Sequence, residues 1–512
     1  MRALARSALA IRPRAKPLVL TAWGLLALLM IARAGLYPAV MTGDEVWFAE
    51  AARNFIAHGI PQRLIHADAV GSSVADFLPP VIMLLQSASF LVFGLTPIGV
   101  AAPSAGVPLI VMVLVFFVAR RAGASTAAAG FASVAIFGSQ IFLRAGIYIR
   151  YEALVCAAFL AYLLATDQAE RASGGRRTAW HFARGSLVAI AGLAYYPTAP
   201  FVGIAALLVE VWRWREARPQ ASGLAALVLG FALPILPFAL YVASYPQIFA
   251  AQILENGAQN YSGFELIRRF LDPALWRQSR DAVPEMLGLL LYFVLGFGLW
   301  ARQSANQRLL LLLAAITALP ALIYPFQPRL LALPMLLALV TLALWAEDQL
   351  GWLGRLAKAA LLAEVAAAVM MAGIILVTIL VQMDGRRYDR ITAEIDGLLR
   401  EPGPVAIDQR AWLAVRAAQP EREVHQVMAA GAADQVQIFE SEILRDPSGG
   451  SHFQYLILNA SDLGPTIAAT PALKEAFAAG RFAVVARISP RFTPLPWASK
   501  PPYDLIVFQR RS

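Results

Sequence analysis

Apolar runs long enough to cross a membrane recur along the first three-quarters of the chain. They start near Lys16 and end near Val381. A helix needs about 20 apolar residues to cross the roughly 30 Å hydrocarbon core of a bilayer, and these runs have that length. After Asp384 the chain changes to mixed polar and apolar sequence. The pattern predicts a transmembrane region over residues 1–383 and a second domain over residues 384–512.

Basic residues between the runs indicate how often the chain crosses. Three long runs, 126–166, 185–211 and 309–345, are each flanked by basic residues. Basic flanks favour the cytoplasm, so a run with two such flanks is predicted to be a hairpin of two helices. The remaining runs are predicted to be single spans: the first from Lys16, then 98–119, 224–241, 286–300 and 359–381. This gives about eleven spans, with the N-terminus in the cytoplasm and the C-terminal domain outside it.

Two amphipathic segments after the first span are predicted to lie along the outer membrane surface. Residues 44–56 place Trp47, Ala51 and Phe55 at helical spacing. Residues 79–94 cannot span, because 98–119 must run inward to leave the following arginines in the cytoplasm. Both segments are therefore expected to be juxtamembrane helices.

The C-terminal region reads as a small α/β domain. Four apolar runs, at 404–408, 455–460, 482–489 and 503–509, are typical of strands, and 471–480 is typical of a helix that ends at Gly480. The region contains no phosphate-binding loop and no dinucleotide fingerprint. A structural or acceptor-facing role is the expectation.

Composition agrees with a membrane protein. The chain is 59% hydrophobic and only 15% charged. Its formal net charge of +10 could suggest nucleic acid, but the arginines form short clusters between apolar runs, where orientation signals belong. Cys156 is the one cysteine, which excludes an intramolecular disulfide. The first run follows a basic tail and lacks a small-residue cleavage site, so it is expected to remain as a signal anchor.

Several arginines are predicted at the outer boundary, against the usual charge trend. They are Arg144, Arg150, Arg329, Arg268 and Arg269. Arginine forms planar, bidentate hydrogen bonds with phosphate oxygens, so a lipid phosphate would account for cations held there. The alternative is contact with ordinary lipid headgroups by snorkelling side chains.

The acids that follow the first span have two interpretations. In the sequence TGDE, Thr42 and Glu45 match a capping box, which leaves Asp44 unused. A carboxylate at a helix start stays ionised and can accept a proton from a hydroxyl. Adjacent helical residues point about 100° apart, so Asp44 and Glu45 are not expected to form the carboxylate pair of a glycosidase. A purely structural cap remains the alternative.

An ordered set of short motifs resembles the GT-C membrane glycosyltransferases. The motifs are GDE, the PP that opens a surface helix ending in FG, then APSAGVPLIVMVLVFFVARR, RYEAL and GLAYYPTAP. The likeness covers about the first 215 residues and is greatest to the protein O-mannosyltransferase and lipid A aminoarabinose transferase branch, glycosyltransferase family 39-like. It implies a polyprenyl-phosphate sugar as donor on the extracytoplasmic side, with Asp44 as the base that deprotonates the acceptor hydroxyl.

The resemblance also assigns nearby residues. Catalytic roles are implied for Glu45, which matches the second acid of the first motif, and for Glu152, which stands where the family has Asp in an RPDAL-like stretch. Arg150 matches the arginine of the same stretch and is expected to contact the donor phosphate. Cations that the family carries before its paired prolines and before the next Pro-Ser are missing, since Leu78 and Ala102 occupy those places. Arg144, Arg329 or the Arg268 and Arg269 pair are expected to supply the phosphate contacts instead.

The sequence also offers aromatic residues and possible metal ligands for the same site. An aromatic groove for sugar or lipid, or an interfacial aromatic belt, would account for Trp47, Tyr148, Tyr195, Tyr196 and Tyr324. His58 and His66 are too far apart in the first loop to predict a metal site. Carboxylates favour hard cations, which leaves open a divalent ion held by Asp44, Glu45 and Glu152.

The sequence predicts an inverting glycosyltransferase at the outer face of a bacterial cytoplasmic membrane. Its acceptor would be a glycolipid, polysaccharide or protein hydroxyl. Two other functions stay open: a transporter or flippase of lipid-linked sugars, which predicts polar residues near mid-membrane and internal repeats, and a non-catalytic partner in polysaccharide assembly.

Overall fold

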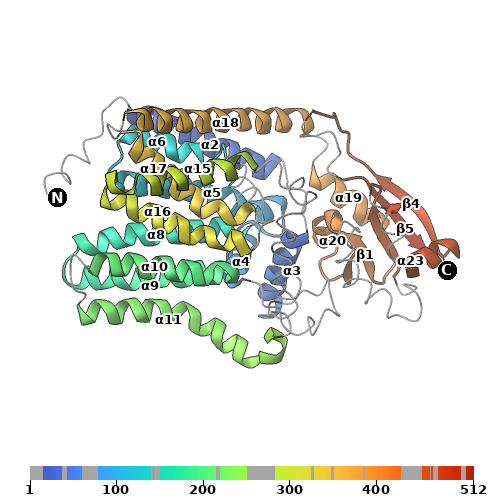
Figure 1. Cartoon of the computed structure of the whole chain (residues 1–512). Coiled ribbons are helices and arrows are strands. Elements are labelled where there is room, and N and C mark those ends of the chain that lie inside the picture. The colour runs from blue at the N-terminus through green and yellow to red at the C-terminus, as the bar shows by residue number, and fades with distance from the viewer. Residues whose placement is uncertain are drawn as a thin grey trace.

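Figure 1 shows a bundle of helices with an α/β unit at one end. The computed structural model describes part of the 512-residue chain. Described are residues 15–36, 43–59, 61, 79–139, 142, 150–214, 220–250, 283–323, 328–347, 351–383, 387–427, 453–461, 463–464, 467, 471–496 and 503–511.

The bundle helices follow the predicted spans in order. Among the described residues, α5, α8, α11 and α18 are long and apolar enough by themselves to cross a membrane, and shorter apolar segments lie in α2, α6, α15, α16 and α17. The predicted polytopic helical fold is confirmed. The bundle comprises α2 (Ala15–Leu36), α5 (Pro97–Ala122), α6 (Thr126–Ala135), α8 (Tyr151–Arg171), α9 (Gly174–Ala194), α10 (Ala199–Trp214), α11 (Ala221–Ser244), α15 (Val283–Gly298), α16 (Ala305–Ile323), α17 (Ala332–Trp345) and α18 (Trp352–Gln382).

Large apolar side chains cover the outside of the bundle. Leu233 on α11 and Leu380 on α18 are more than half exposed, as are many of their neighbours on the same helices. Soluble monomers rarely leave contiguous apolar surface of this extent open to water. The exposed faces are therefore suited to lipid, with the backbone polar groups satisfied inside each helix.

Two details of the bundle differ from the sequence prediction. Helix α6 ends at Ala135, well before the predicted outer turn, and the chain then passes close to α18: a Cβ on Gly138 would lie 2.2 Å from the carbonyl oxygen of Glu364. Helix α9 begins at Gly174, so Arg184 is not a flank of the span. It is buried and forms an ion pair with Glu210 of α10.

Helices α3 (Gly43–His58) and α4 (Pro80–Phe93) are the two predicted surface helices. Figure 1 shows α3 running across the end of the bundle instead of along it. Helix α4 has 14 residues, too few to span, and Gly94 ends it with φ of 70°. The amide of Gln86 donates to the Gly99 carbonyl at 2.8 Å, which ties α4 to the start of α5.

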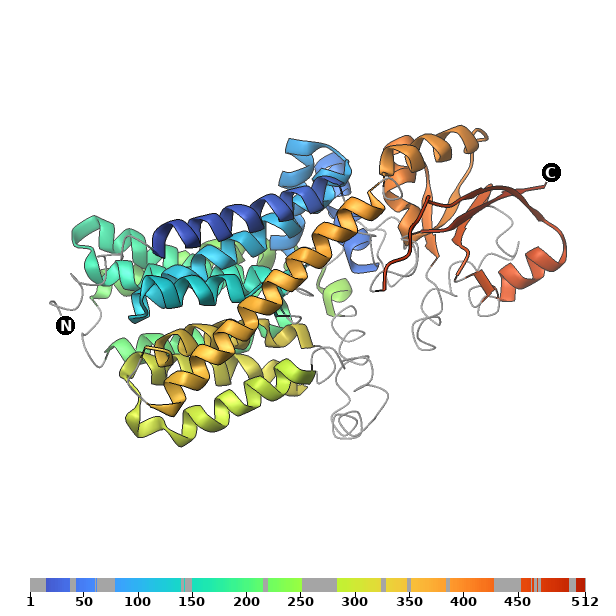
Figure 2. The same ribbon diagram turned by 90° about the horizontal axis from the view of Figure 1, so that it is seen from above.

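The C-terminal α/β unit (residues 387–511) contains a five-stranded sheet of order β2-β1-β3-β5-β4. Strand β1 pairs in parallel with β2 and β3, whereas β5 pairs antiparallel with β3 and β4. Figure 2 shows α18 passing obliquely across the bundle to reach this unit. The strands are β1 (Val405–Asp408), β2 (Val424–Val427), β3 (Tyr455–Asn459), β4 (Phe482–Ile488) and β5 (Leu505–Arg510).

Four of these strands and one helix were predicted from the sequence. Helix α23 (Pro471–Ala478) is followed by Gly480 in the left-handed region with φ of 67°, as expected. Strand β2 and the helices α19 (Tyr388–Leu398) and α20 (Trp412–Ala418) were missed. Strand β2 has only four residues, two of them polar, and α20 has seven, so neither shows a clear period.

An ion pair between β4 and the start of β5 makes the C-terminal unit sensitive to acid. The Arg487 guanidinium donates to Asp504 at 2.8 and 2.5 Å, and these bonds hold the pKa of Asp504 below its usual value. A depressed carboxyl pKa adds stability above the unfolded-state pKa, and this stability is lost as the pH falls through the folded-state value.

Asp504→Asn is expected to lower the hydrogen-exchange protection of β5 a few-fold near neutral pH in the full chain. Comparing variant and wild type at each pH cancels the intrinsic pH dependence of exchange. The difference should vanish well below the carboxyl pKa, because both side chains are then neutral. Asp389→Asn, which breaks a local Arg387 pair in α19, is the matched control and should leave β5 unchanged. Equal loss of β5 protection at acid and neutral pH would contradict the prediction.

Candidate functional site

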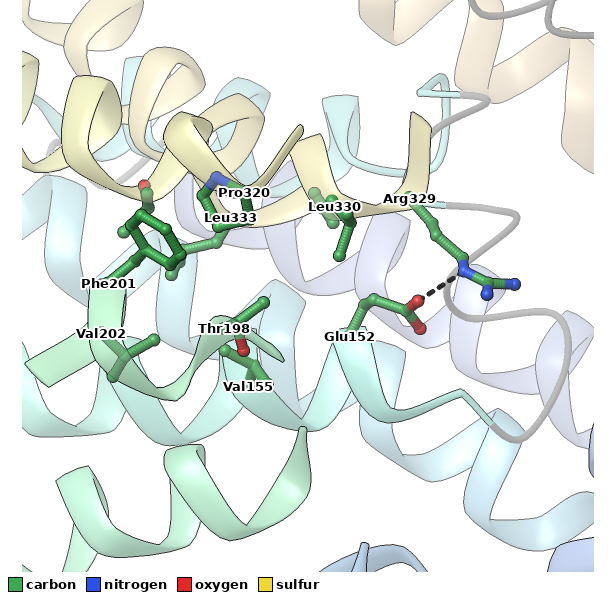
Figure 3. A pocket seen from close by; sticks show the side chains of 11 residues that line it. Glu152, Val155, Thr198, Phe201, Val202, Pro320, Arg329, Leu330 and Leu333 are labelled. Carbon is green, nitrogen blue, oxygen red and sulfur yellow. Dashed lines mark ion pairs between the residues drawn. The ribbon is translucent and has the colours of Figure 1, made fainter. Parts of the chain in front are cut away.

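A pocket lies between α8, α10, α16 and α17 at the end of the bundle where α3 packs. It contains roughly 320 Å³ of empty space, its open mouth included. Figure 3 shows Glu152 and Arg329 at one end of the pocket and Phe201 and Val202 toward the other. The pocket is lined by Glu152, Val155, Thr198, Phe201, Val202, Thr317, Pro320, Arg329, Leu330, Ala332 and Leu333.

The polar end of the pocket is an ion pair. Arg329 Nε lies 2.7 Å from Glu152 Oε1, and the Glu152 side chain is only 3% exposed whereas that of Arg329 is 23% exposed. A buried carboxylate is unfavourable unless a cation compensates it, so Arg329 is fixed beside Glu152. The pair thus presents a partly exposed guanidinium at the end of an apolar pocket.

Local structure explains how these two residues meet. Glu152 lies in the first turn of α8, where the helix dipole favours a carboxylate. Arg329 comes from the short 3₁₀ helix η5 (Pro328–Leu331), which leads directly into α17. Arg329 Nη2 also donates to the Tyr151 hydroxyl at 3.2 Å, and the guanidinium lies 5.7 Å from the centre of that ring.

An aromatic cluster connects the ion pair to helix α3. The Tyr151 ring stacks on Tyr195 with centres 4.0 Å apart, and Phe48 of α3 packs edge-on against Tyr151 at 6.0 Å. Asp44 precedes Phe48 by four residues in the same helix, so the two positions share one face of α3. The face of α3 that carries Phe48 therefore packs against this aromatic cluster.

Several predicted site residues fall outside the described part of the structure. The side chains of Asp44 and Glu45 do, although both residues belong to α3. Thr42 of the expected capping box and His66 are also outside it. So are five residues predicted for the phosphate site or the groove: Arg144, Tyr148, Arg268, Arg269 and Tyr324.

Of the predicted site residues in the described part of the chain, Glu152 and Arg329 line the pocket and the others do not. Arg150 occupies the N-cap position of α8 and Trp47 lies half-buried on α3. Tyr196, in the 3₁₀ helix η2 (Tyr196–Thr198), stacks on Phe238 with centres 5.3 Å apart. Tyr195 stacks on Tyr151 and is not among the pocket-lining residues.

Sequence reasoning missed two contributors to the site. Tyr151 orients Arg329, and Thr317 lines the pocket from α16. The position of Tyr151 directly before Glu152 in the RYEAL motif was the available signal. The sequence gives no such signal for Thr317, because an isolated threonine in an apolar run is also typical of a transmembrane helix.

No group of three or more histidine, cysteine, aspartate or glutamate side chains could hold a metal ion in the described part of the chain. The divalent ion considered with Asp44, Glu45 and Glu152 involves two side chains outside it.

The fold of this chain is the one found in solved structures of GT-C membrane glycosyltransferases. No protein-family model and no curated protein matches the sequence. Among solved structures, ArnT from Cupriavidus metallidurans bound to undecaprenyl phosphate is similar with a TM-score of 0.56 and 14% identity. The match covers 96% of this chain and 97% of ArnT.

Two other structures share the fold. An oligosaccharyltransferase from Archaeoglobus fulgidus in the apo form has a TM-score of 0.50 at 13% identity, covering 89% of this chain and 72% of that one. The arabinofuranosyltransferase AftD from Mycobacteria has a TM-score of 0.50 at 13% identity, covering 97% of this chain and 40% of that one. At these identities the comparisons show that the chain has the GT-C fold.

Proposed function

We propose that this chain is an inverting glycosyltransferase that uses a polyprenyl-phosphate sugar as donor. The acceptor would be a hydroxyl of a glycolipid, polysaccharide or protein at the outer face of a bacterial cytoplasmic membrane. The observation that carries the proposal is the Arg329–Glu152 ion pair at the end of an apolar pocket, near the helix whose first turn carries Asp44.

The pocket has the two properties that a lipid phosphate requires. Phe201, Val202 and Leu333 offer apolar walls to a lipid chain, and Arg329 offers a cation at its polar end. A guanidinium binds phosphate oxygens in a planar, bidentate way, and contacts with Glu152 and Tyr151 orient this one before ligand arrives. Arg150, Arg144, Arg268 and Arg269 are proposed as further contacts to the donor phosphate.

The chemical step is a single displacement at the anomeric carbon. The acceptor oxygen forms a bond to that carbon while the carbon–oxygen bond to the phosphate breaks, and the phosphate keeps the electron pair. Asp44 takes the proton of the acceptor hydroxyl as general base. Arg329 stabilises the negative charge that develops on the phosphate. Attack opposite the leaving group inverts the configuration.

Helix α3 supports this assignment of the base. Phe48 packs on Tyr151, which hydrogen-bonds to Arg329, so the helix that carries Asp44 and Glu45 is joined to the proposed phosphate site. The fold adds support, since the similar ArnT structure is bound to undecaprenyl phosphate. The aromatic residues Trp47, Tyr148, Tyr195, Tyr196 and Tyr324 are proposed to border the donor and acceptor paths.

A proteoliposome assay separates this function from transport. Purified protein is reconstituted with a polyprenyl-phosphate sugar labelled on the sugar, together with an acceptor fraction from the cell envelope. A transferase converts the label to a new product and leaves polyprenyl phosphate. Movement of intact label to the other leaflet without cleavage would overturn the proposal in favour of a flippase. A protein that neither cleaves nor moves the donor would fit the non-catalytic partner.

A further inference from the structure

A buried ionic contact joins α3 to the C-terminal α/β unit. The Glu50 side chain is completely buried, and Arg416 of α20 is 3% exposed. Arg416 Nη2 forms an ion pair with Glu50 Oε1, and its Nε donates to Oε2 at 3.1 Å. Trp412 Nε1 donates to the same Oε2 at 2.8 Å. Three donors from one short helix thus converge on one carboxylate of α3.

Neighbouring contacts extend this connection along the same face of α3. Arg53, one turn after Glu50, lies 3.7 Å from the Glu50 carboxylate, 3.5 Å from Glu421, and donates to the Pro420 carbonyl. Arg416 Nη1 donates a hydrogen bond to the Arg422 carbonyl at 2.6 Å. The C-terminal unit is therefore bound to α3 by a network of ion pairs and hydrogen bonds and not by one isolated pair.

The network and the pocket lie on opposite sides of α3. Glu50 follows Phe48 by two residues, which places it about 200° around the helix from the contact with Tyr151. On its remaining side the helix contacts α4, where Ser87 Oγ donates to the Ala52 carbonyl at 3.3 Å. The C-terminal unit therefore contacts α3 on the face opposite to the one that packs on Tyr151, and these contacts fix the position of the helix.

We propose that Glu50 is a positioning residue: through Arg416 and Trp412, the C-terminal α/β unit holds α3, the helix whose first turn carries Asp44, in place beside the donor site. This proposal rests on the proposed function. A buried carboxylate costs a large free energy of desolvation unless a cation and hydrogen-bond donors contact it. The network therefore specifies a single position of α3, and misplacing a catalytic group by about 1 Å can cost ~100-fold in rate.

Two variants of the full chain test the contact. Arg416→Met leaves the Glu50 carboxylate buried without its strongest partner. The double variant E50Q/R416M removes both charges, and a glutamine oxygen still accepts from Trp412. Turnover at saturating donor, affinity for undecaprenyl phosphate and hydrogen exchange of α3 are measured for each. Asp504→Asn, an ion-pair variant of the same unit that does not contact α3, is the control.

The single variant is expected to lose about tenfold in turnover, with the dissociation constant for undecaprenyl phosphate changed less than about twofold. Protection of α3 should fall at the same time. In the double variant both turnover and α3 protection should return toward wild type, because no buried charge is left unpaired. A structural defect of the whole protein would lower donor affinity too and would not be rescued.

Three results would overturn the proposal: unchanged α3 protection in Arg416→Met, full turnover despite a loosened α3, or equal loss of turnover and donor affinity without rescue. Absence of turnover by the wild type with any donor and acceptor would instead reject the function on which the proposal rests. The α3 exchange data would still decide separately whether the C-terminal unit holds the helix.

Discussion

Asp44→Asn is expected to lower sugar transfer at least ~100-fold, because a positioned general base typically contributes that much to the rate. Asparagine keeps the size of the side chain and its capacity to accept a hydrogen bond at the helix start, but it cannot take a proton. Donor affinity should change little, since the proposed phosphate contact comes from Arg329. Polyprenyl phosphate release under saturating donor measures the effect.

The neighbouring acid provides the matched control. Glu45→Gln removes a carboxylate from the same helical turn, but adjacent residues point about 100° apart and cannot both reach the acceptor proton. We expect it to lose less than about tenfold. Thermal melting of both variants checks that neither change unfolds the protein. Equal activity of Asp44→Asn and wild type would show that Asp44 is not the base and has only a structural role at the start of the helix.

Arg329→Met is expected to lower turnover by ~100-fold or more and to weaken binding of undecaprenyl phosphate. Loss of one preorganised donor to a developing oxyanion costs about 2.7–4 kcal/mol in comparable sites. Here the change also leaves Glu152 buried without the cation that lies 2.7 Å away. Rate and binding measurements on the purified full chain give both effects.

A double variant separates the two roles of Arg329. If the arginine only neutralises Glu152, then E152Q/R329M restores activity because no buried charge is left unpaired. If it binds the donor phosphate, the double variant stays as inactive as the single one. The proposed function predicts the second result. Arg329→Lys retains the charge without the planar fork, and we expect it to keep intermediate activity.

Much of the fold was predictable because lipid imposes length and charge rules on each span. The basic flanks divided the long run 309–345 into a hairpin, and the structure has α16 and α17 there. Residues 79–94 were predicted to be a non-spanning helix because 98–119 must run inward, and the structure has the 14-residue helix α4 there. What could not be predicted was where a helix ends inside its run: α6 stops at Ala135, and the close approach of Gly138 to α18 depends on tertiary packing.

The site was predictable as a location but not as a set of contacts. Topology placed Glu152 and Arg329 at one boundary, yet it could not show that they pair, because spacing along the chain does not encode packing between hairpins. Glu50 lies in the segment 44–56, which was predicted as an amphipathic surface helix, but the pattern assigned this glutamate no role of its own. Its partner Arg416 lies in a seven-residue helix with no visible period, so nothing in the sequence joined them.

The most direct test of the account is the product balance of the purified wild-type protein. Donors with different sugars on polyprenyl phosphate are incubated with glycolipid, polysaccharide and protein acceptors from the cell envelope. We expect at least one combination to release one polyprenyl phosphate for each sugar transferred, with the opposite anomeric configuration in the product. Release with retained configuration would contradict the single displacement by Asp44, and absence of release with every combination would contradict the glycosyltransferase itself.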